Sequence, residues 1–114
     1  VQQRAFAIIH GEADSTNSSG YAALLEAFFT AWESAVGTIP IKVISLLSPD
    51  QTASNFAAMR PEQIAFGNAH QGYYDTTGLV VSTIDNVHFT TGSRYRIGLG
   101  LGALIRASAP ALWL

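Results

Sequence analysis

The residues that could carry out chemistry begin with the segment His10-Gly11-Glu12-Ala13-Asp14, which combines an imidazole with two carboxylates. In an extended chain, alternate side chains project to the same side, so His10, Glu12 and Asp14 would form a mixed nitrogen and oxygen set. Such a set suits a divalent metal or a carboxylate acid/base pair. The competing interpretation is a solvated loop after a strand, and no second cluster with established ligand spacing supports a metal. We therefore expect neither a metal nor another cofactor.

The next segment, Ser15-Thr16-Asn17-Ser18-Ser19-Gly20, is rich in hydroxyl and amide groups. It lies between an expected strand end and an expected helix start. Free backbone N–H groups and the positive end of the helix dipole favour an anion at such a position. Ser15, Thr16, Asn17, Ser18 and Ser19 are therefore candidate ligand-binding residues. The alternative is a capping loop that binds only water, because every helix start has free N–H groups.

A third group follows further along the chain and consists of Asn68, His70, Tyr73, Tyr74 and Asp75, with Gly67 and Gly72 among them. Aromatic side chains and a histidine in a glycine-punctuated loop could line a pocket for a small ligand. Alternatively, the histidine is a surface or hydrogen-bonding residue.

Recognised catalytic motifs are missing from the sequence, which has no nucleophile elbow, no phosphate-binding P-loop and no zinc motif. The run Gly98-Leu99-Gly100-Leu101-Gly102 has the wrong spacing for a dinucleotide-binding loop. The sequence favours a non-catalytic protein.

The elements that must position these residues begin with a strand over residues 4–10, whose apolar side chains on both faces suit a parallel sheet. Apolar residues at helical spacing predict a helix over residues 21–36, capped by Ser18 or Ser19 and stopped by Gly37. We expect its core face to be Leu24, Leu25, Phe28 and Trp32. Residues 39–47 predict a second strand, because β-branched side chains are frequent there.

Ser48-Pro49-Asp50-Gln51 has the pattern of a capping box and predicts a second helix with a core face of Ala53, Phe56 and Ala57. Pro61 is expected to end it, and residues 63–67 to form a third, short strand. Residues 79–90 and 94–103 predict a hairpin with a turn at Thr91-Gly92-Ser93, and glycines occupy one face of the second strand. The expected fold is α/β, or α+β, with a βαβαβ unit followed by a C-terminal hairpin, one sheet and two helices.

The composition supports a single domain over residues 1–114. Only 12% of the residues are charged, which favours exposed apolar patches and a homo-oligomer over a monomer covered by uncharged polar residues. The net charge of -2 and the single lysine, Lys42, argue against a nucleic-acid partner. No apolar run is long enough to span a membrane. The absence of cysteine is compatible with a reducing or an oxidising compartment, so localisation stays open.

Short segments in residues 6–68 also match a family in order and spacing. They are Phe6-Ala7-Ile8-Ile9, the loop containing Glu12, a long helix, Ile41-Lys42-Val43, Ser48-Pro49-Asp50, Ala58-Met59-Arg60 and the stretch from Gln63 to Asn68. This part of the chain resembles the N-terminal lobe of periplasmic substrate-binding proteins of the phosphonate and phosphite type. The resemblance implies an oxyanion ligand near helix N-termini. That family closes two lobes on its ligand, whereas 114 residues supply about one.

Two functions are consistent with these observations. The first is a small non-catalytic domain that binds an oxyanion or another small solute. The alternative is a self-assembling structural or interaction subunit, such as a virion component, which the low charge and the glycine-faced strand favour. A small metal-dependent enzyme using His10, Glu12 and Asp14 is a third, less supported possibility.

Overall fold

The structure is a computed structural model that describes residues 4–52 and 55–109. Its elements in chain order are β1 (Ala5–Ile8), the 3-10 helix η1 (Ser15–Asn17), α1 (Tyr21–Val36), β2 (Ile41–Ser45), α2 (Phe56–Ala69), β3 (Tyr73–Tyr74) and α3 (Thr91–Ser108). The strands form one parallel sheet in the order β1-β2-β3. The α/β class is therefore confirmed.

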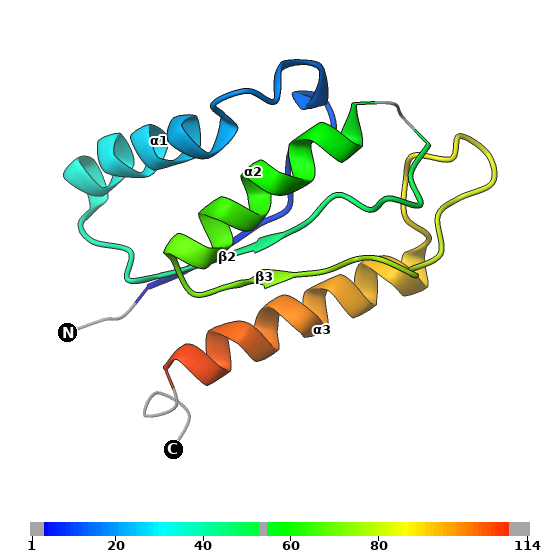
Figure 1. Cartoon of the computed structure of the whole chain (residues 1–114). Helices are drawn as coiled ribbons and strands as arrows, with labels where there is room; N and C mark the ends of the chain where they lie inside the picture. The colour runs from blue at the N-terminus through cyan, green and yellow to red at the C-terminus, as the bar shows by residue number, and fades with distance from the viewer. Residues whose placement is uncertain (1–3, 53–54, 110–114) are drawn as a thin grey trace.

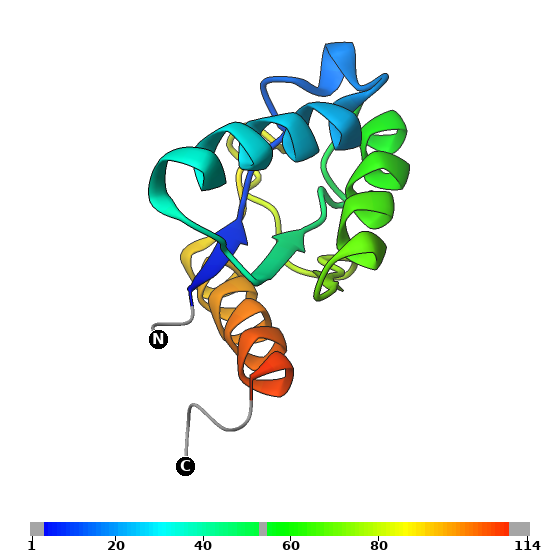
Figure 2. The same cartoon turned by 90° about the vertical axis from the view of Figure 1, so that its left-hand side faces the viewer.

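Helices cover both faces of this sheet (Figure 1). α1 and α2 lie together on one face, and α3 lies on the other. Two apolar clusters result. One contains Ile44 of β2 with Phe29 of α1 and Phe66 of α2, and the other contains Val43 of β2 with Ile97 of α3. The view along the sheet shows β1 at one side, with β2 between it and β3 (Figure 2).

β2 is the buried centre of the molecule, and all five of its residues are buried. Its β-branched residues suit a strand covered on both faces. Lys42 is the charged residue of this strand. Its ammonium group donates to the carbonyl oxygen of Ile39 at 2.7 Å and pairs with Glu33 of α1 at 2.9 Å. The other carboxylate oxygen of Glu33 accepts from the backbone N–H of Ile39, so the charge is paired and the end of α1 is tied to β2.

The helix predicted over residues 21–36 is confirmed as α1, but part of its predicted core face is wrong. Phe29 is 1% exposed, whereas Phe28 is 53% and Leu24 65% exposed. Because β1 is the edge strand of the described sheet, no described strand lies beneath the side of α1 that carries Leu24 and Phe28. The predicted cap is also wrong, since Gly20 occupies the N-cap position with φ +76° and no side chain caps the helix.

The second helix begins later than predicted and continues through Pro61. Ser48 and Gln51 do make the side-chain contact of a capping box: the Gln51 side-chain oxygen accepts from the Ser48 N–H at 2.7 Å. The chain forms a turn there instead of a helix, and α2 begins at Phe56, while Ala53 lies outside the described residues. Phe56 is buried as predicted, but Ala57 is exposed.

The predicted strand over residues 63–67 is wrong, because these residues form the second half of α2. Pro61 removes one backbone hydrogen bond from the helix. Burial of Met59, Gln63 and Phe66 on the face toward the sheet outweighs this loss, since tertiary packing supplies most of the stability of a helix in a protein. The third strand is instead β3, which pairs with Ile44 and Ser45 and contains the two tyrosines predicted to lie in a loop.

The predicted hairpin is also wrong: residues 94–103 lie in α3, and the preceding segment has one isolated bridge between Val81 and Phe89. Residues of this segment that are four positions apart also lie on one face of a helix. The buried residues of α3 have this spacing, and they are Ser93, Ile97 and Leu101. The segment interpreted as a turn is the helix start, where the Thr90 hydroxyl accepts from the Ser93 N–H.

Candidate functional site

A groove of about 590 Å³ lies between β1 and the first half of α1. Most of its wall is apolar, and a small polar region closes the end near the carboxyl terminus of β1. Ligands of parallel α/β proteins commonly bind at this end of the strands. The lining residues are Phe6, Ala7, Ile8, Ile9, His10, Asp14, Asn17, Tyr21, Leu24, Leu25, Phe28 and Phe29.

The polar region is organised around His10. Its Nδ1 atom lies 2.8 Å from the Tyr21 hydroxyl, and its Nε2 atom lies 3.2 Å from Oδ2 of Asp14. The His10 and Tyr21 rings are stacked, with centroids 5.9 Å apart. A neutral His10 that accepts from Tyr21 at Nδ1 carries its hydrogen on Nε2, facing the carboxylate. The imidazole is thereby oriented, but both of its nitrogens already have partners.

Tyr21 keeps its phenolic proton at neutral pH. Burial, followed by the nearby charge of Asp14, raises the pKa of Tyr21 from 10.0 to about 12. Both effects disfavour the phenolate. Tyr21 therefore holds His10 in place and is not activated as a base or nucleophile.

Gln63 of α2 joins the ends of β1 and β2 beneath the polar region. Its side-chain amide donates to the carbonyl oxygen of His10 at 2.9 Å, and its side-chain oxygen accepts from the N–H of Leu47 at 2.7 Å. Gly11 has φ +117°, and a Cβ atom there would lie 2.9 Å from the Gln63 side-chain nitrogen. Sequence reasoning missed Gln63, because its partners are backbone groups that leave no pattern along the chain.

The three residues considered as metal ligands do not converge. His10 pairs with Asp14, whereas the side-chain oxygen of Glu12 lies 3.4 Å from the amide nitrogen of Gln51. Within residues 4–52 and 55–109, no three His, Asp or Glu side chains come together as a metal site would require. The described residues give no support to a metal centre.

The predicted anion loop is divided between two environments. Asn17 lines the groove, while Ser15 is buried and its hydroxyl donates to the carbonyl oxygen of Glu12. Ser18 is half-buried, and Thr16 and Ser19 are exposed. The groove therefore brings together residues from two predicted segments, namely His10, Asp14 and Asn17.

The third predicted group is distributed over both faces of the sheet. His70 pairs with Glu26 of α1 at 2.5 Å, and Asn68 is exposed near the end of α2. Tyr73 packs against the cluster under α1 and α2, whereas Tyr74 packs against the cluster under α3. Asp75 pairs with Arg60, so these side chains have separate partners.

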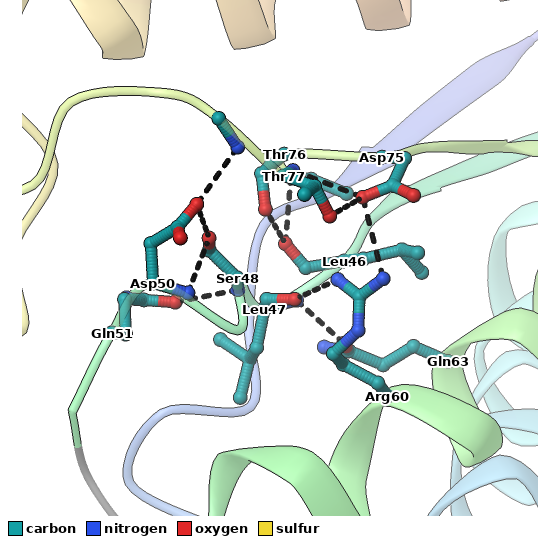
Figure 3. Close-up of polar contacts among 12 residues, drawn as sticks. Leu46, Leu47, Ser48, Asp50, Gln51, Arg60, Gln63, Asp75, Thr76 and Thr77 are labelled. Carbon is teal, nitrogen blue, oxygen red and sulfur yellow. Dashed lines mark hydrogen bonds and ion pairs between the residues drawn. The ribbon is translucent and has the colours of Figure 1, made fainter.

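A second polar network, which sequence reasoning did not find, ties the carboxyl end of β2 to that of β3 (Figure 3). The buried hydroxyl of Thr76 donates to the Leu46 carbonyl oxygen at 3.0 Å. Arg60 donates to the carbonyl oxygen of Leu47 and pairs with Asp75 at 3.3 Å. Hydrogen bonds from Thr77 and the positive charge of Arg60 lower the pKa of Asp75.

The buried polar side-chain atoms of this network are all hydrogen-bonded. Asp50 accepts from the Gly78 N–H at 2.7 Å, and the Gln51 amide donates to the Val87 carbonyl oxygen at 2.5 Å. Among the described residues, every buried side-chain nitrogen and oxygen has a hydrogen-bond partner. We interpret the network as structural, since it holds the loops at the carboxyl end of the sheet.

Comparison of the chain with family models, curated proteins and solved structures gives no match. In the part of the chain that the structure describes, no helix combines the length and apolar character needed to cross a membrane.

Proposed function

We propose that the chain is a non-catalytic binding domain that holds a small solute in the groove between β1 and α1. The observation that carries this proposal is the composition of the groove, which is mainly apolar and has a few polar groups at one end. Small-molecule sites commonly combine an apolar wall with a small number of fixed polar contacts. The solute would therefore have an apolar body and one polar group.

An oxyanion is the first polar group to test. Asn17 and the start of α1 lie at the polar end, and a helix N-terminus favours negative charge. Asp14 lies in the same region and opposes an anion, whereas it would accept a hydrogen bond from a neutral donor. The charge of the polar group is thus the property that an experiment must determine.

The proposal is tested by calorimetric titration with methyl-, butyl- and hexylphosphonate and with the corresponding primary amides. Each buried methylene contributes about 0.8 kcal/mol, so affinity should rise roughly fourfold per carbon while the chain stays inside the groove. A preference for the amides at equal chain length would assign a neutral polar group in place of the oxyanion.

Matched variants localise the binding. Leu24→Ser places a polar group in the groove wall, whereas Leu99→Ser makes the same change at an exposed position on α3. Leu24→Ser and Asn17→Ala should each weaken hexylphosphonate binding, and Leu99→Ser should leave it unchanged. An affinity that does not depend on chain length, or equal effects of the two serine variants, would contradict the proposal.

A specific observation also favours the second candidate function, self-association. Ile9, Leu24 and Phe28 are each more than half exposed, and all three border the groove beside the edge strand. Exposed apolar side chains gathered in one place commonly mark a protein contact.

A further inference from the structure

Among the residues that the structure describes, the outer side of β1 is an unpaired strand edge. β1 pairs with β2 there, and the Ile41 N–H donates to the Arg4 carbonyl oxygen. In a parallel ladder, residues alternate between bonding to one neighbour and facing the other side. The N–H and C=O groups of Arg4, Phe6 and Ile8 therefore face β2. Those of Ala5, Ala7 and Ile9 face outward.

In the described ranges, this edge lacks the features that usually prevent strand addition. Proteins protect such edges with charged side chains, proline, bulges or a covering element. The four residues of β1 are Ala5, Phe6, Ala7 and Ile8, with no charge and no proline among them. Ile9 is 65% exposed next to the strand.

We propose that β1 pairs antiparallel with β1 of a second copy across a two-fold axis, which joins the two sheets into one. The occupant is a second copy because the edge is self-complementary in one register. If Ala7 lies opposite Ala7 of the partner subunit, then Ala5 lies opposite Ile9 of the partner subunit. All of the outward N–H and C=O groups then face one another in hydrogen-bonded pairs.

Charge complementarity supports the same register. Arg4 and His10 lie at opposite ends of the strand segment, and both side chains project to the α1 face with Phe6 and Ile8. With Ala7 on the two-fold axis, Arg4 lies opposite His10 of the partner subunit. Asp14 pairs with His10 and has a side chain that is 54% exposed, so its carboxylate is accessible to the incoming guanidinium group, which in its own copy donates to the Val36 carbonyl oxygen.

The exposed part of α1 also gains a partner in this arrangement. Leu24 and Phe28 border the groove on the α1 face, next to the edge strand. A two-fold axis at Ala7 brings the α1 helices of both copies to the same face of the joined sheet. The partner's α1 would then lie beside these exposed side chains. Because Ala7, Ile9, Leu24 and Phe28 also line the groove, the proposed solute and the partner subunit would contact the same surface.

Sedimentation equilibrium over a micromolar to sub-millimolar range tests the pairing. We expect a monomer–dimer equilibrium in the parent protein. Ala7→Lys places two ammonium groups opposite each other at the two-fold axis and should weaken dimerisation at least roughly tenfold. Ala7→Val keeps the strand neutral and β-branched, and it should retain the dimer. A parent protein that stays monomeric, or an Ala7→Lys variant that dimerises like the parent, would overturn the proposal.

A charge exchange tests the register. Arg4→Glu and Asp14→Arg should each weaken dimerisation, because each places like charges across the interface. A mixture of the two variants should form heterodimers, since the introduced carboxylate of one variant then faces the introduced guanidinium group of the other. The native Arg4 and Asp14 that remain in the two variants face each other in the same way. Failure of the mixture to dimerise, with both variants folded by circular dichroism, would exclude this register.

Amide hydrogen exchange by nuclear magnetic resonance gives a readout that does not rely on substitutions. The Ala5, Ala7 and Ile9 amides should become protected as concentration rises, whereas those of Phe6 and Ile8 are already paired with β2 and should change little. Uniform protection of all these amides, or none, would contradict pairing along this edge.

Discussion

Gln63 shows how a single side chain secures the candidate site. It is fully buried, and its amide group bridges the His10 carbonyl oxygen and the Leu47 N–H. The ends of β1 and β2 are therefore held at one spacing, and His10 is presented at the polar end of the groove. A hydrophobic side chain of similar length would fill the space but leave two buried backbone groups without partners.

We predict that Gln63→Met lowers the free energy of unfolding by about 2–6 kcal/mol, because each of the two unsatisfied backbone groups costs about 1–3 kcal/mol. Urea denaturation measures the effect. Asn68→Ala, at an exposed position on the same helix, is the control and should change stability by less than about 0.5 kcal/mol. Equal stability of Gln63→Met and the parent would show that the bridge contributes nothing.

A second prediction at the residue scale concerns His88. Its Nδ1 atom lies 2.5 Å from Asp85, and this hydrogen bond and the carboxylate charge raise the pKa of His88 above its ordinary value of 6.5. Hydrogen bonds from Val87 and His88 lower the pKa of Asp85. Titration followed by nuclear magnetic resonance should show the raised pKa, and Asp85→Asn should return the pKa of His88 toward 6.5.

The raised pKa of His88 and the lowered pKa of Asp85 determine how this pair changes the stability of the protein with pH. The contribution of His88 is fully present below pH 6.5 and is lost as pH rises through its raised pKa in the folded state. The contribution of Asp85 is present above its ordinary pKa of 3.8 and is lost as pH falls through its lowered pKa. The difference in the free energy of unfolding between the parent and Asp85→Asn should therefore be largest between pH 3.8 and pH 6.5, the ordinary pKa values of the two groups. A difference that grows above neutral pH would contradict this assignment.

At the scale of elements, α3 shows why alternating apolar residues were insufficient to predict a strand. Its glycines have different roles. A Cβ atom on Gly100 would overlap the Tyr74 ring, whereas Gly98 and Gly102 have nothing within 4 Å of that position. Gly100 thus allows α3 to approach β3, and the other two glycines only add flexibility to the unfolded chain.

Three alanine variants separate these roles. We predict that Gly98→Ala and Gly102→Ala each raise the free energy of unfolding by about 0.5–1 kcal/mol, because alanine is the better helix former. Gly100→Ala should lower it, since the Tyr74 ring must move. Thermal unfolding followed by circular dichroism measures all three. An increase in Gly100→Ala similar to that of the other two would mean that α3 does not pack on Tyr74.

At the scale of the whole molecule, β2 connects two apolar clusters on opposite faces of the sheet. Phe29 and Ile44 belong to one cluster, and Ile97 and Val43 to the other. Adjacent residues of one strand thus support both layers, and loss of either layer exposes the same strand. We therefore expect the two layers to unfold together.

The corresponding prediction is that Phe29→Ala lowers stability by about 3–5 kcal/mol and Ile97→Ala by about 2–5 kcal/mol. Phe28→Ala is the matched control and should cost less than about 1 kcal/mol, because Phe28 is 53% exposed. In each core variant, exchange of the Val43 and Ile44 amides should accelerate equally. Selective acceleration of one amide would show that the layers unfold separately.

The sequence alone determined the elements whose signals are local and uninterrupted. The helix over residues 21–36, its stop at Gly37 and the central buried strand follow from apolar periodicity and β-branched residues that few charges interrupt. Of the residues predicted to bind a ligand in the loop after the first strand, Asn17 lines the groove. His10 and Asp14, which were considered as metal ligands, line it as well.

Only the tertiary structure decided the features that depend on partners distant in the chain. Residues 63–67 and 94–103 have patterns compatible with more than one element, and packing against β2 and β3 makes both helical. The edge position of β1 decides that Phe29 is buried and Phe28 exposed. Gln63 acts on backbone groups 53 and 16 residues away, so its role exists only after the strands have come together.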